Sequence, residues 1–326
     1  ALDAGVLSVM VSFNSWNGEK LHGSEYWLNG VLKNELGFEG FVVSDWQGID
    51  QISGNYYNAV VTAINAGIDM NMVPSAYLKY LETLKTAVEN GDISIERIDD
   101  AVHRILAVKF KLGLFEQPYS QPDLQSDVGS DSHRAIAREA VRKSLVLLKN
   151  EGKMIPLSKD TPMIFVAGKG ARDIGLQSGG WSIEWQGMPG NISPGTTILE
   201  GIREAVNNPE YVIFDRKGLF SQQTEENGTP QIADVGIVVV AENPYAEGVG
   251  DKEDLTLPDS DIDLIQEMRK RSEKLLVIIL SGRPLVITEQ YQIADAWIAA
   301  WLPGTQGEGV ADVLFGDFPF TGKLPY

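Results

Sequence analysis

Short, nearly continuous apolar runs alternate along the chain with stretches in which apolar residues return every three or four positions. The run at 5–13 (GVLSVMVSF) predicts a strand that is covered on both faces. Residues 24–37 predict a helix that ends at a left-handed Gly37, and its apolar face would comprise Leu28, Val31, Leu32 and Leu36. A second buried strand is predicted at 40–44, where the sequence reads GFVVS.

The same alternation continues through the rest of the first third. We expect a strand at 68–73 and helices at 58–67, 76–90 and 95–112. Ser94 would cap the last helix and Gly113 would end it. Strands and helices that alternate with short connections favour a parallel sheet.

Residues 114–132 (LFEQPYSQPDLQSDVGSDS) have no periodicity and are typical of a linker. We therefore divide the chain into a first domain at 1–117, a linker at 118–132 and a second domain at 133–326. The second domain repeats the α/β alternation and predicts an open doubly wound sheet. Its expected strands are 144–150, 163–168, 211–215, 234–241, 275–280 and 295–301, and its expected helices include 197–207 and 261–274.

Composition narrows the classes of function. The 27 Lys and Arg against 45 Asp and Glu give a formal charge of -18, which disfavours a nucleic-acid partner. No apolar run is long enough to predict a membrane span. The absence of cysteine excludes disulfides, thiolate nucleophiles and Cys-ligated metals. The three histidines, His22, His103 and His133, form no HxxxH pair, and we interpret them as structural.

An aspartate and a tryptophan stand side by side where the strand at 40–44 ends. Ligands of parallel α/β folds bind at the carboxyl ends of strands, so Asp45 is a candidate functional carboxylate. It could equally be a turn or helix-capping aspartate. A tryptophan in a loop exposes apolar surface unless a flat group stacks on it, and the C–H face of a sugar ring is such a group. Trp46 therefore favours a carbohydrate site.

The loop at 241–258 follows the most apolar strand of the second domain and is rich in carboxylates. Hydrolysis of a glycosidic bond requires two of them, one ionised and one protonated. The spacing of residues does not indicate whether Glu242 or Glu247 would be one of these two carboxylates. Most of the acidic residues in the loop could simply face solvent. The loop lacks the order of an EF-hand calcium site.

Two further stretches offer candidate chemistry. Trp181 and Trp185 lie in a glycine-flanked loop, which is typical of a binding wall, and Glu184 between them could bind a sugar or face solvent. The stretch at 163–175 partly matches a dinucleotide fingerprint, but Asp173 replaces the required glycine. We therefore expect no nucleotide cofactor.

Three segments together resemble glycoside hydrolase family 3, most closely its branch of exo-acting β-glucan glucohydrolases and β-glucosidases. They are GFVVSDWQGID, HRAIAREAVRKSLVLLKN and AWLPGTQGEGVADVLFGDFPFTGKLP. The resemblance covers essentially the whole chain. It implies the C-terminal half of a TIM-type (β/α) barrel followed by an αβα sandwich, with the active site in the cleft between these domains.

The resemblance also assigns roles. It implies that Asp45 is the nucleophile and that Glu247, rather than Glu242, is the acid/base. The reaction implied is that of a retaining exo-acting β-D-glucosidase that releases glucose from β-glucans or β-gluco-oligosaccharides. In a retaining enzyme the two carboxyl groups lie about 5–5.5 Å apart. The expected partner is a β-linked glucosyl saccharide, no cofactor or metal is expected, and the oligomeric state stays open.

Aromatic and apolar residues complete the implied site. Trp46 and Trp185 would clamp the leaving-group sugar, with Trp181 beside them in the second domain. Met10 and Phe13 would line the glucose pocket. Relatives often have tyrosine in place of Phe13 and arginine in place of Gln51, and these departures bear on leaving-group specificity.

Several alternatives accompany this assignment. β-Xylosidase activity occurs in the same family, whereas N-acetylglucosaminidases usually take their acid/base from a histidine loop of the barrel. The family's barrel also needs strands before Ala1. We therefore expect an internal piece of a longer periplasmic or extracellular protein. By itself the piece would be poorly stable and weakly active, or would bind carbohydrate without hydrolysing it, because half a barrel has open strand edges.

Overall fold

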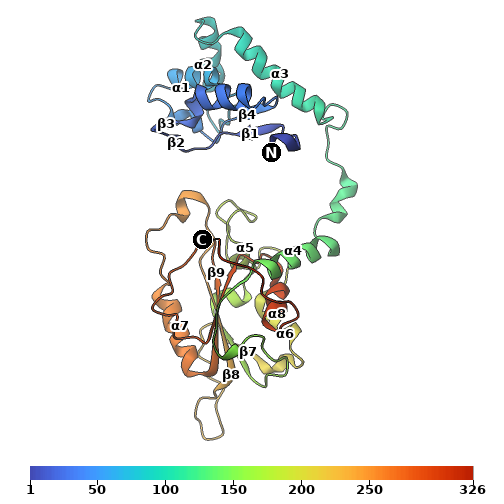
Figure 1. The fold of residues 1–326 in the computed structure, drawn as a ribbon, viewed down its shortest axis with the longest axis vertical. Coiled ribbons are helices and arrows are strands. Elements are labelled where there is room, and N and C mark those ends of the chain that lie inside the picture. Colours follow the sequence, from blue (N-terminus) through green and yellow to red (C-terminus); the bar gives the residue numbers. More distant parts are fainter. Residues whose placement is uncertain (326) are drawn as a thin grey trace. The chain divides into compact units, whose positions relative to one another are not determined.

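The computed structural model describes residues 1–325, and the chain divides into two compact units, Ala1–Pro122 and Asp123–Tyr326 (Figure 1). The first unit contains a parallel pair of strands, β1 and β4, and a small hairpin of β2 and β3. The bounds of its elements are β1 Ser8–Met10, β2 Ser15–Trp16, β3 Glu19–Lys20, a π-helix Tyr26–Glu35, β4 Phe41–Val43, α1 Tyr56–Ala66, α2 Tyr77–Glu89 and α3 Ile95–Lys111.

The helices of the first unit begin and end close to the positions that the sequence predicts. Ser94 caps α3, since its side chain accepts a hydrogen bond from the Arg97 N–H, and Asn55 caps α1 in the same way. Gly67 ends α1 with φ +117°, a conformation that glycine adopts without strain. Apolar side chains from β4, α1 and the π-helix share one core, including Val42, Val60, Ile64 and Leu28.

Two strand predictions in this unit are wrong in extent. Only Ser8–Met10 of the run at 5–13 is a strand, and Met10 is 53% exposed rather than covered on both faces. Residues 68–73 form no strand, and only an isolated bridge joins Met70 to Val43. Leu36, expected on the buried face of a helix, lies just beyond the π-helix and is exposed.

The second unit is built on a six-stranded sheet in the order β5-β10-β9-β8-β6-β7. All neighbouring strands are parallel except β5, which runs antiparallel to β10 at the edge. The bounds are α4 Asp131–Ser144, β5 Val146–Asn150, β6 Ile164–Ala167, α5 Ile174–Ser178, α6 Ile198–Ala205, β7 Val212–Phe214, β8 Ala233–Ala241, α7 Asp259–Lys270, β9 Ser272–Leu280, β10 Ala296–Trp301 and α8 Gly307–Leu314.

Helices cover both faces of this sheet (Figure 1). Alternate residues of β8 point to opposite sides: Ile237 and Val239 pack with α4, α6 and α8, whereas Val238 and Val240 pack with α7. The strands are therefore apolar throughout, as burial on two faces requires. All six predicted strands of this unit are confirmed, and the mixed α/β fold class is confirmed with them.

The strand order reverses beside β6. The chain passes from β6 to β7 on one side and then returns to β8 on the other. In open α/β sheets a crevice forms at such a point, outside the carboxyl ends of the strands, and ligands bind there. Loop residues from 242 onward, which follow β8, leave the sheet at this position. No helix within residues 1–325 has the length and hydrophobicity that crossing a bilayer requires.

Candidate active site

Asp45 lies immediately beyond the carboxyl end of β4 and is half-buried. Its backbone N–H donates a hydrogen bond to Nε2 of His22 at 3.0 Å. Its Oδ1 accepts a hydrogen bond from the Trp46 N–H at 2.6 Å. The preceding residue, Ser44, is buried, and its Oγ accepts a hydrogen bond from the Met72 N–H at 2.8 Å. The backbone that carries Asp45 is therefore held from two directions.

His22 is buried beside this carboxylate. Burial lowers the pKa of His22, the negative charge of Asp45 raises it by less, and Lys20 lowers it further. Because Nε2 accepts the Asp45 N–H, the neutral ring carries its proton on Nδ1. Gly48 also lies against this ring, where an added Cβ would be 2.2 Å from Nε2.

A buried charge cluster supports β4. Asp69 forms ion pairs with Lys33 at 2.8 Å and with Arg97 at 2.5 Å, and its side chain is fully buried. The second carboxylate oxygen of Asp69 accepts a hydrogen bond from the Val42 N–H at 2.8 Å. Burial lowers the pKa of Lys33, while the hydrogen bond and charge of Asp69 oppose that shift. The cluster therefore fixes the strand that leads to Asp45.

Met10 and Phe13 lie near the same end of the small parallel sheet. Met10 is opposite Val43 in the register of β1 and β4, so the two strands end together. The Phe13 ring meets the His22 ring edge-on at a centroid distance of 5.7 Å. Trp46 is 59% exposed, so its ring is available for stacking. These residues place apolar and aromatic surface near the Asp45 carboxylate.

Glu247 begins a 3-10 turn, Glu247–Gly250, in the loop that follows β8. It is exposed and has a φ of +51°, a left-handed conformation that is uncommon outside glycine. Glu247 lines a cavity of about 270 Å³ together with Trp181 and Tyr245. The second unit therefore presents an accessible carboxylate next to an aromatic ring.

The loop that carries the two tryptophans is tied to the loop of Glu247. The Ala246 N–H donates to Oε1 of Gln186 at 2.9 Å. Trp181 is 69% exposed and Trp185 53%, and their ring centroids are 6.4 Å apart. The Trp181 N–H donates to the Trp185 carbonyl at 2.9 Å, which closes the tryptophan loop on itself.

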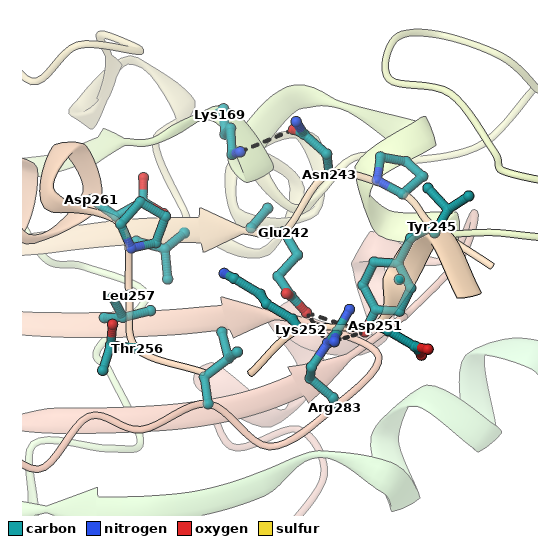
Figure 2. Close-up of a pocket in the computed structure, with 17 residues that line it drawn as sticks. Lys169, Glu242, Asn243, Tyr245, Asp251, Lys252, Thr256, Leu257, Asp261 and Arg283 are labelled. Carbon is teal, nitrogen blue, oxygen red and sulfur yellow. Dashed lines mark hydrogen bonds and ion pairs between the residues drawn. The ribbon is translucent and has the colours of Figure 1, made fainter. Parts of the chain in front are cut away.

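Glu242 has a different environment. Its carboxylate pairs with Nε of Arg283 at 3.2 Å and accepts a hydrogen bond from the Tyr245 hydroxyl at the same distance (Figure 2). Burial raises the pKa of Tyr245, and the hydrogen bond from Arg283 opposes that shift. The Glu242 carboxylate is largely buried and held in an ion pair, and this geometry favours a structural role for Glu242.

These residues also border a second cavity of about 390 Å³ on the side of the sheet that α7 covers (Figure 2). Asp261, in the first turn of α7, lines this cavity and is buried, and burial raises its pKa although Lys169 opposes the shift. Lys169 donates to Oδ1 of Asn243 at 3.1 Å. Within residues 1–325, no cluster of three or more His, Cys, Asp or Glu could hold a metal ion.

Comparison with known proteins gives a consistent result for both units. Residues 1–108 match the glycosyl hydrolase family 3 N-terminal domain, and residues 145–326 match the family's C-terminal domain. The chain belongs to glycosyl hydrolase family 3. The family resemblance expected from the three sequence segments is thereby confirmed.

Three relatives illustrate the similarity. The chain is 33% identical to a lysosomal beta glucosidase of Dictyostelium discoideum, over 99% of the chain and 42% of that protein. It is 33% identical to a periplasmic beta-glucosidase of Salmonella typhimurium, and this match covers 99% of the chain and 46% of that protein. The crystal structure of an exo-1,3/1,4-beta-glucanase from a Pseudoalteromonas species superposes on this structure with a TM-score of 0.89 and is 40% identical in sequence. The superposition covers 98% of this chain and 41% of that protein. The chain thus spans less than half of each protein.

The candidate residues of this family member gather in two groups, one in each unit. Met10, Phe13, Asp45 and Trp46 lie at or just beyond the carboxyl ends of β1 and β4. Trp181, Trp185 and Glu247 lie in two loops of the second unit that a hydrogen bond connects. Each group combines one accessible carboxylate with aromatic surface.

Sequence reasoning misses the residues that hold the backbone beside these carboxylates. It predicts only a structural role for His22, without the hydrogen bond that joins this residue to Asp45 across 23 positions. It assigns no role to Gln186 or Arg283, although Gln186 binds the backbone next to Glu247 and Arg283 binds Tyr245. No local spacing signals these contacts, because each partner comes from a distant segment.

Proposed function

We propose that the whole protein is a retaining exo-acting β-glucosidase that releases glucose from β-glucans or β-gluco-oligosaccharides. The observation that carries this proposal is Asp45, a partly accessible carboxylate at the carboxyl end of a parallel strand, beside the exposed ring of Trp46. Family membership and the names of the three relatives support it. A neutral saccharide is also compatible with a formal charge of -18.

In this proposal Asp45 is the nucleophile and Glu247 the acid/base. Asp45 attacks the anomeric carbon and forms a glycosyl ester while the glycosidic C–O bond breaks, and Glu247 donates a proton to the departing oxygen. Glu247 then accepts a proton from water, and that water attacks the anomeric carbon and releases Asp45. Two inversions give net retention.

The neighbouring residues supply binding rather than bond making. Trp46, Trp181 and Trp185 present exposed rings that suit the C–H faces of sugars. Met10 and Phe13 provide apolar surface near Asp45, and we propose that they line the glucosyl pocket. One relative is named for the periplasm, which supports a periplasmic or extracellular location for the whole protein.

Trapping the intermediate in the full-length protein tests the nucleophile. A fluorinated β-glucoside that slows hydrolysis of the ester should label the peptide containing Asp45, and mass spectrometry would locate the label. Asp45→Asn should lower kcat by at least about 10³-fold. Asp50→Asn, which alters an exposed carboxylate in the same loop, is the matched control and should have little effect.

The stereochemical course and substrate class complete the test. NMR during early turnover of an aryl β-glucoside should show β-glucose as the first product. Label on another residue, or α-glucose as the first product, would refute the two-step scheme with Asp45. Faster turnover of an aryl β-xyloside than of the glucoside would instead assign the protein as a β-xylosidase.

A further inference from the structure

The carboxylate of Glu247 depends on its own backbone for its position. Among the hydrogen bonds of residues 1–325, none involves the Glu247 side chain. The residue also holds a left-handed φ of +51° at the start of a short turn. A conformation that is intrinsically unfavourable persists only where its surroundings enforce it.

Tyr245 is the residue that fixes both sides of this turn. Its carbonyl lies against Gly180 of the tryptophan loop, where an added Cβ would be 2.0 Å from the oxygen. Its ring lies against Gly250, where an added Cβ would be 2.3 Å from Cδ2. Both approaches are possible only because these positions are glycines. The turn at 247–250 is thus held between the Tyr245 ring at its end and the Gln186 hydrogen bond at its beginning.

Arg283, just beyond the carboxyl end of β9, in turn holds Tyr245. Its Nε donates to the Tyr245 hydroxyl at 2.7 Å, and its guanidinium lies over the tyrosine ring at 3.9 Å from the centroid (Figure 2). Glu242 pairs with the same nitrogen at 3.2 Å, and both partners of this pair are largely buried, with side chains 17% and 15% exposed. A partly buried pair is screened less by water than a surface pair, so it restricts Arg283 to one orientation.

We propose that Arg283 is a positioning residue for Glu247, which it holds through Tyr245, with Glu242 as its counter-ion. This inference rests on the proposed role of Glu247 as the acid/base. Proton transfer depends on heavy-atom distance, so a small displacement of the carboxylate weakens acid catalysis while leaving the nucleophile unaffected.

That dependence gives a signature that loss of structure does not produce. An oxygen leaving group of low pKa departs without a proton, whereas a sugar hydroxyl requires one. The constant to compare is kcat/KM, because it reports formation of the glycosyl ester and excludes the later step in which Glu247 acts as base. A variant that only misplaces Glu247 should therefore lose activity on a disaccharide and keep it on a dinitrophenyl β-glucoside.

The test compares variants of the full-length protein on these two substrates. Tyr245→Phe removes only the hydroxyl and should lower kcat/KM for laminaribiose by about tenfold, with less than about a twofold change on the dinitrophenyl glucoside. Arg283→Lys keeps the positive charge but removes the planar guanidinium group, and it should show the same selective loss. Tyr291→Phe is the matched control, because that hydroxyl donates to the Leu148 carbonyl elsewhere in the unit, and it should change neither constant.

Glu247→Gln is the reference variant that separates the acid/base role of Glu247 from the positioning role of Arg283. It should lower kcat/KM for the disaccharide by about 10²–10⁴-fold and spare the activated substrate. If this variant shows the selective loss while Tyr245→Phe and Arg283→Lys lower both constants equally or not at all, the positioning role is refuted and the acid/base role stands. If Glu247→Gln itself shows no selectivity, the acid/base assignment fails, and the positioning role fails with it.

Discussion

The imidazole of His22 accepts a hydrogen bond from the backbone N–H of Asp45 at 3.0 Å. The bond joins a short 3-10 turn, Leu21–Gly23, to the end of β4. It requires an unprotonated Nε2, and burial favours that neutral form by lowering the pKa of His22. The backbone that carries the proposed nucleophile is thus held by a group that can titrate.

This relationship predicts how stability depends on pH. Since the pKa of His22 is lower in the folded state, the unfolded chain binds the proton first, and stability is lost as pH falls from about 6.5 through the folded pKa. Above pH 6.5 the contribution is fully present. His22→Gln keeps an acceptor that does not titrate, so urea unfolding between about pH 7 and pH 5 should show a shallower loss than in the wild type.

The exposed His103 supplies the control for this experiment. His103→Gln should follow the wild-type pH dependence, because this exposed side chain takes no part in the hydrogen bond between His22 and Asp45. Equal slopes for His22→Gln and the wild type would contradict the prediction.

The charge cluster that supports β4 predicts a large loss of stability. Asp69→Asn leaves Lys33 and Arg97 buried without their shared anion, and it should lower the free energy of unfolding of the first unit by about 3–5 kcal/mol. Denaturant titration would measure the change. Glu89→Gln, which breaks the exposed pair with Lys85, should change it far less, and similar losses in the two variants would argue against the role of burial.

The sequence predicts the second unit more completely than the first for a physical reason. Strands buried on two faces, such as β8 and β9, must be apolar at nearly every position, and such runs are visible without any knowledge of their neighbours. The helix predicted at 261–274 ends earlier, at Lys270, because β9 already begins at Ser272. Local propensity cannot show where a neighbouring strand begins to pair.

In the first unit and at the candidate site, the pattern of residues along the chain does not predict how far strands pair or which carboxylate is exposed. The run at 5–13 has the composition of a buried strand, but pairing with β4 extends only over Ser8–Met10. Glu242 and Glu247 are equivalent along the chain, whereas the structure pairs Glu242 with Arg283, 41 positions away, and leaves Glu247 exposed. Long-range contacts of this kind determine whether a carboxylate is held in an ion pair or is exposed, and the local spacing of residues does not reveal them.

The cavity on the α7 side predicts a stabilising substitution. Burial raises the pKa of Asp261, so the folded state loses stability as pH rises from the unfolded value of 3.8 through the raised value. Asp261→Asn removes the buried charge and should raise the melting temperature at neutral pH more than at about pH 4.

A neighbouring aspartate provides the matched control. Asp259 begins α7 and is exposed, so its charge interacts favourably with the helix N-terminus. Asp259→Asn should slightly lower the melting temperature at neutral pH, opposite in sign to Asp261→Asn. A loss of stability in Asp261→Asn at neutral pH would show that the carboxylate has a favourable interaction that burial does not outweigh.

Two glycines in one turn predict opposite tolerance. An added Cβ at Gly250 would meet the Tyr245 ring at 2.3 Å, whereas nothing lies within 4 Å of the corresponding position at Gly248. Gly250→Ala should lower the free energy of unfolding of the second unit by about 1–3 kcal/mol, and Gly248→Ala should leave it nearly unchanged. Denaturant melts of the two variants would measure the difference, and equal values would show that the ring moves aside without cost.

The reversal of strand order beside β6 also has a consequence for which segments of the second unit can be exchanged. The segment after β8 leaves the sheet there, while the ladder between β8 and β9 ends at Ala241 and Leu280. Segments grafted from other members of the family beyond Ala241 can therefore vary in length without altering strand register. Exchange of this one segment would therefore change the surroundings of Tyr245 and Glu247 while the strands of the sheet keep their pairing.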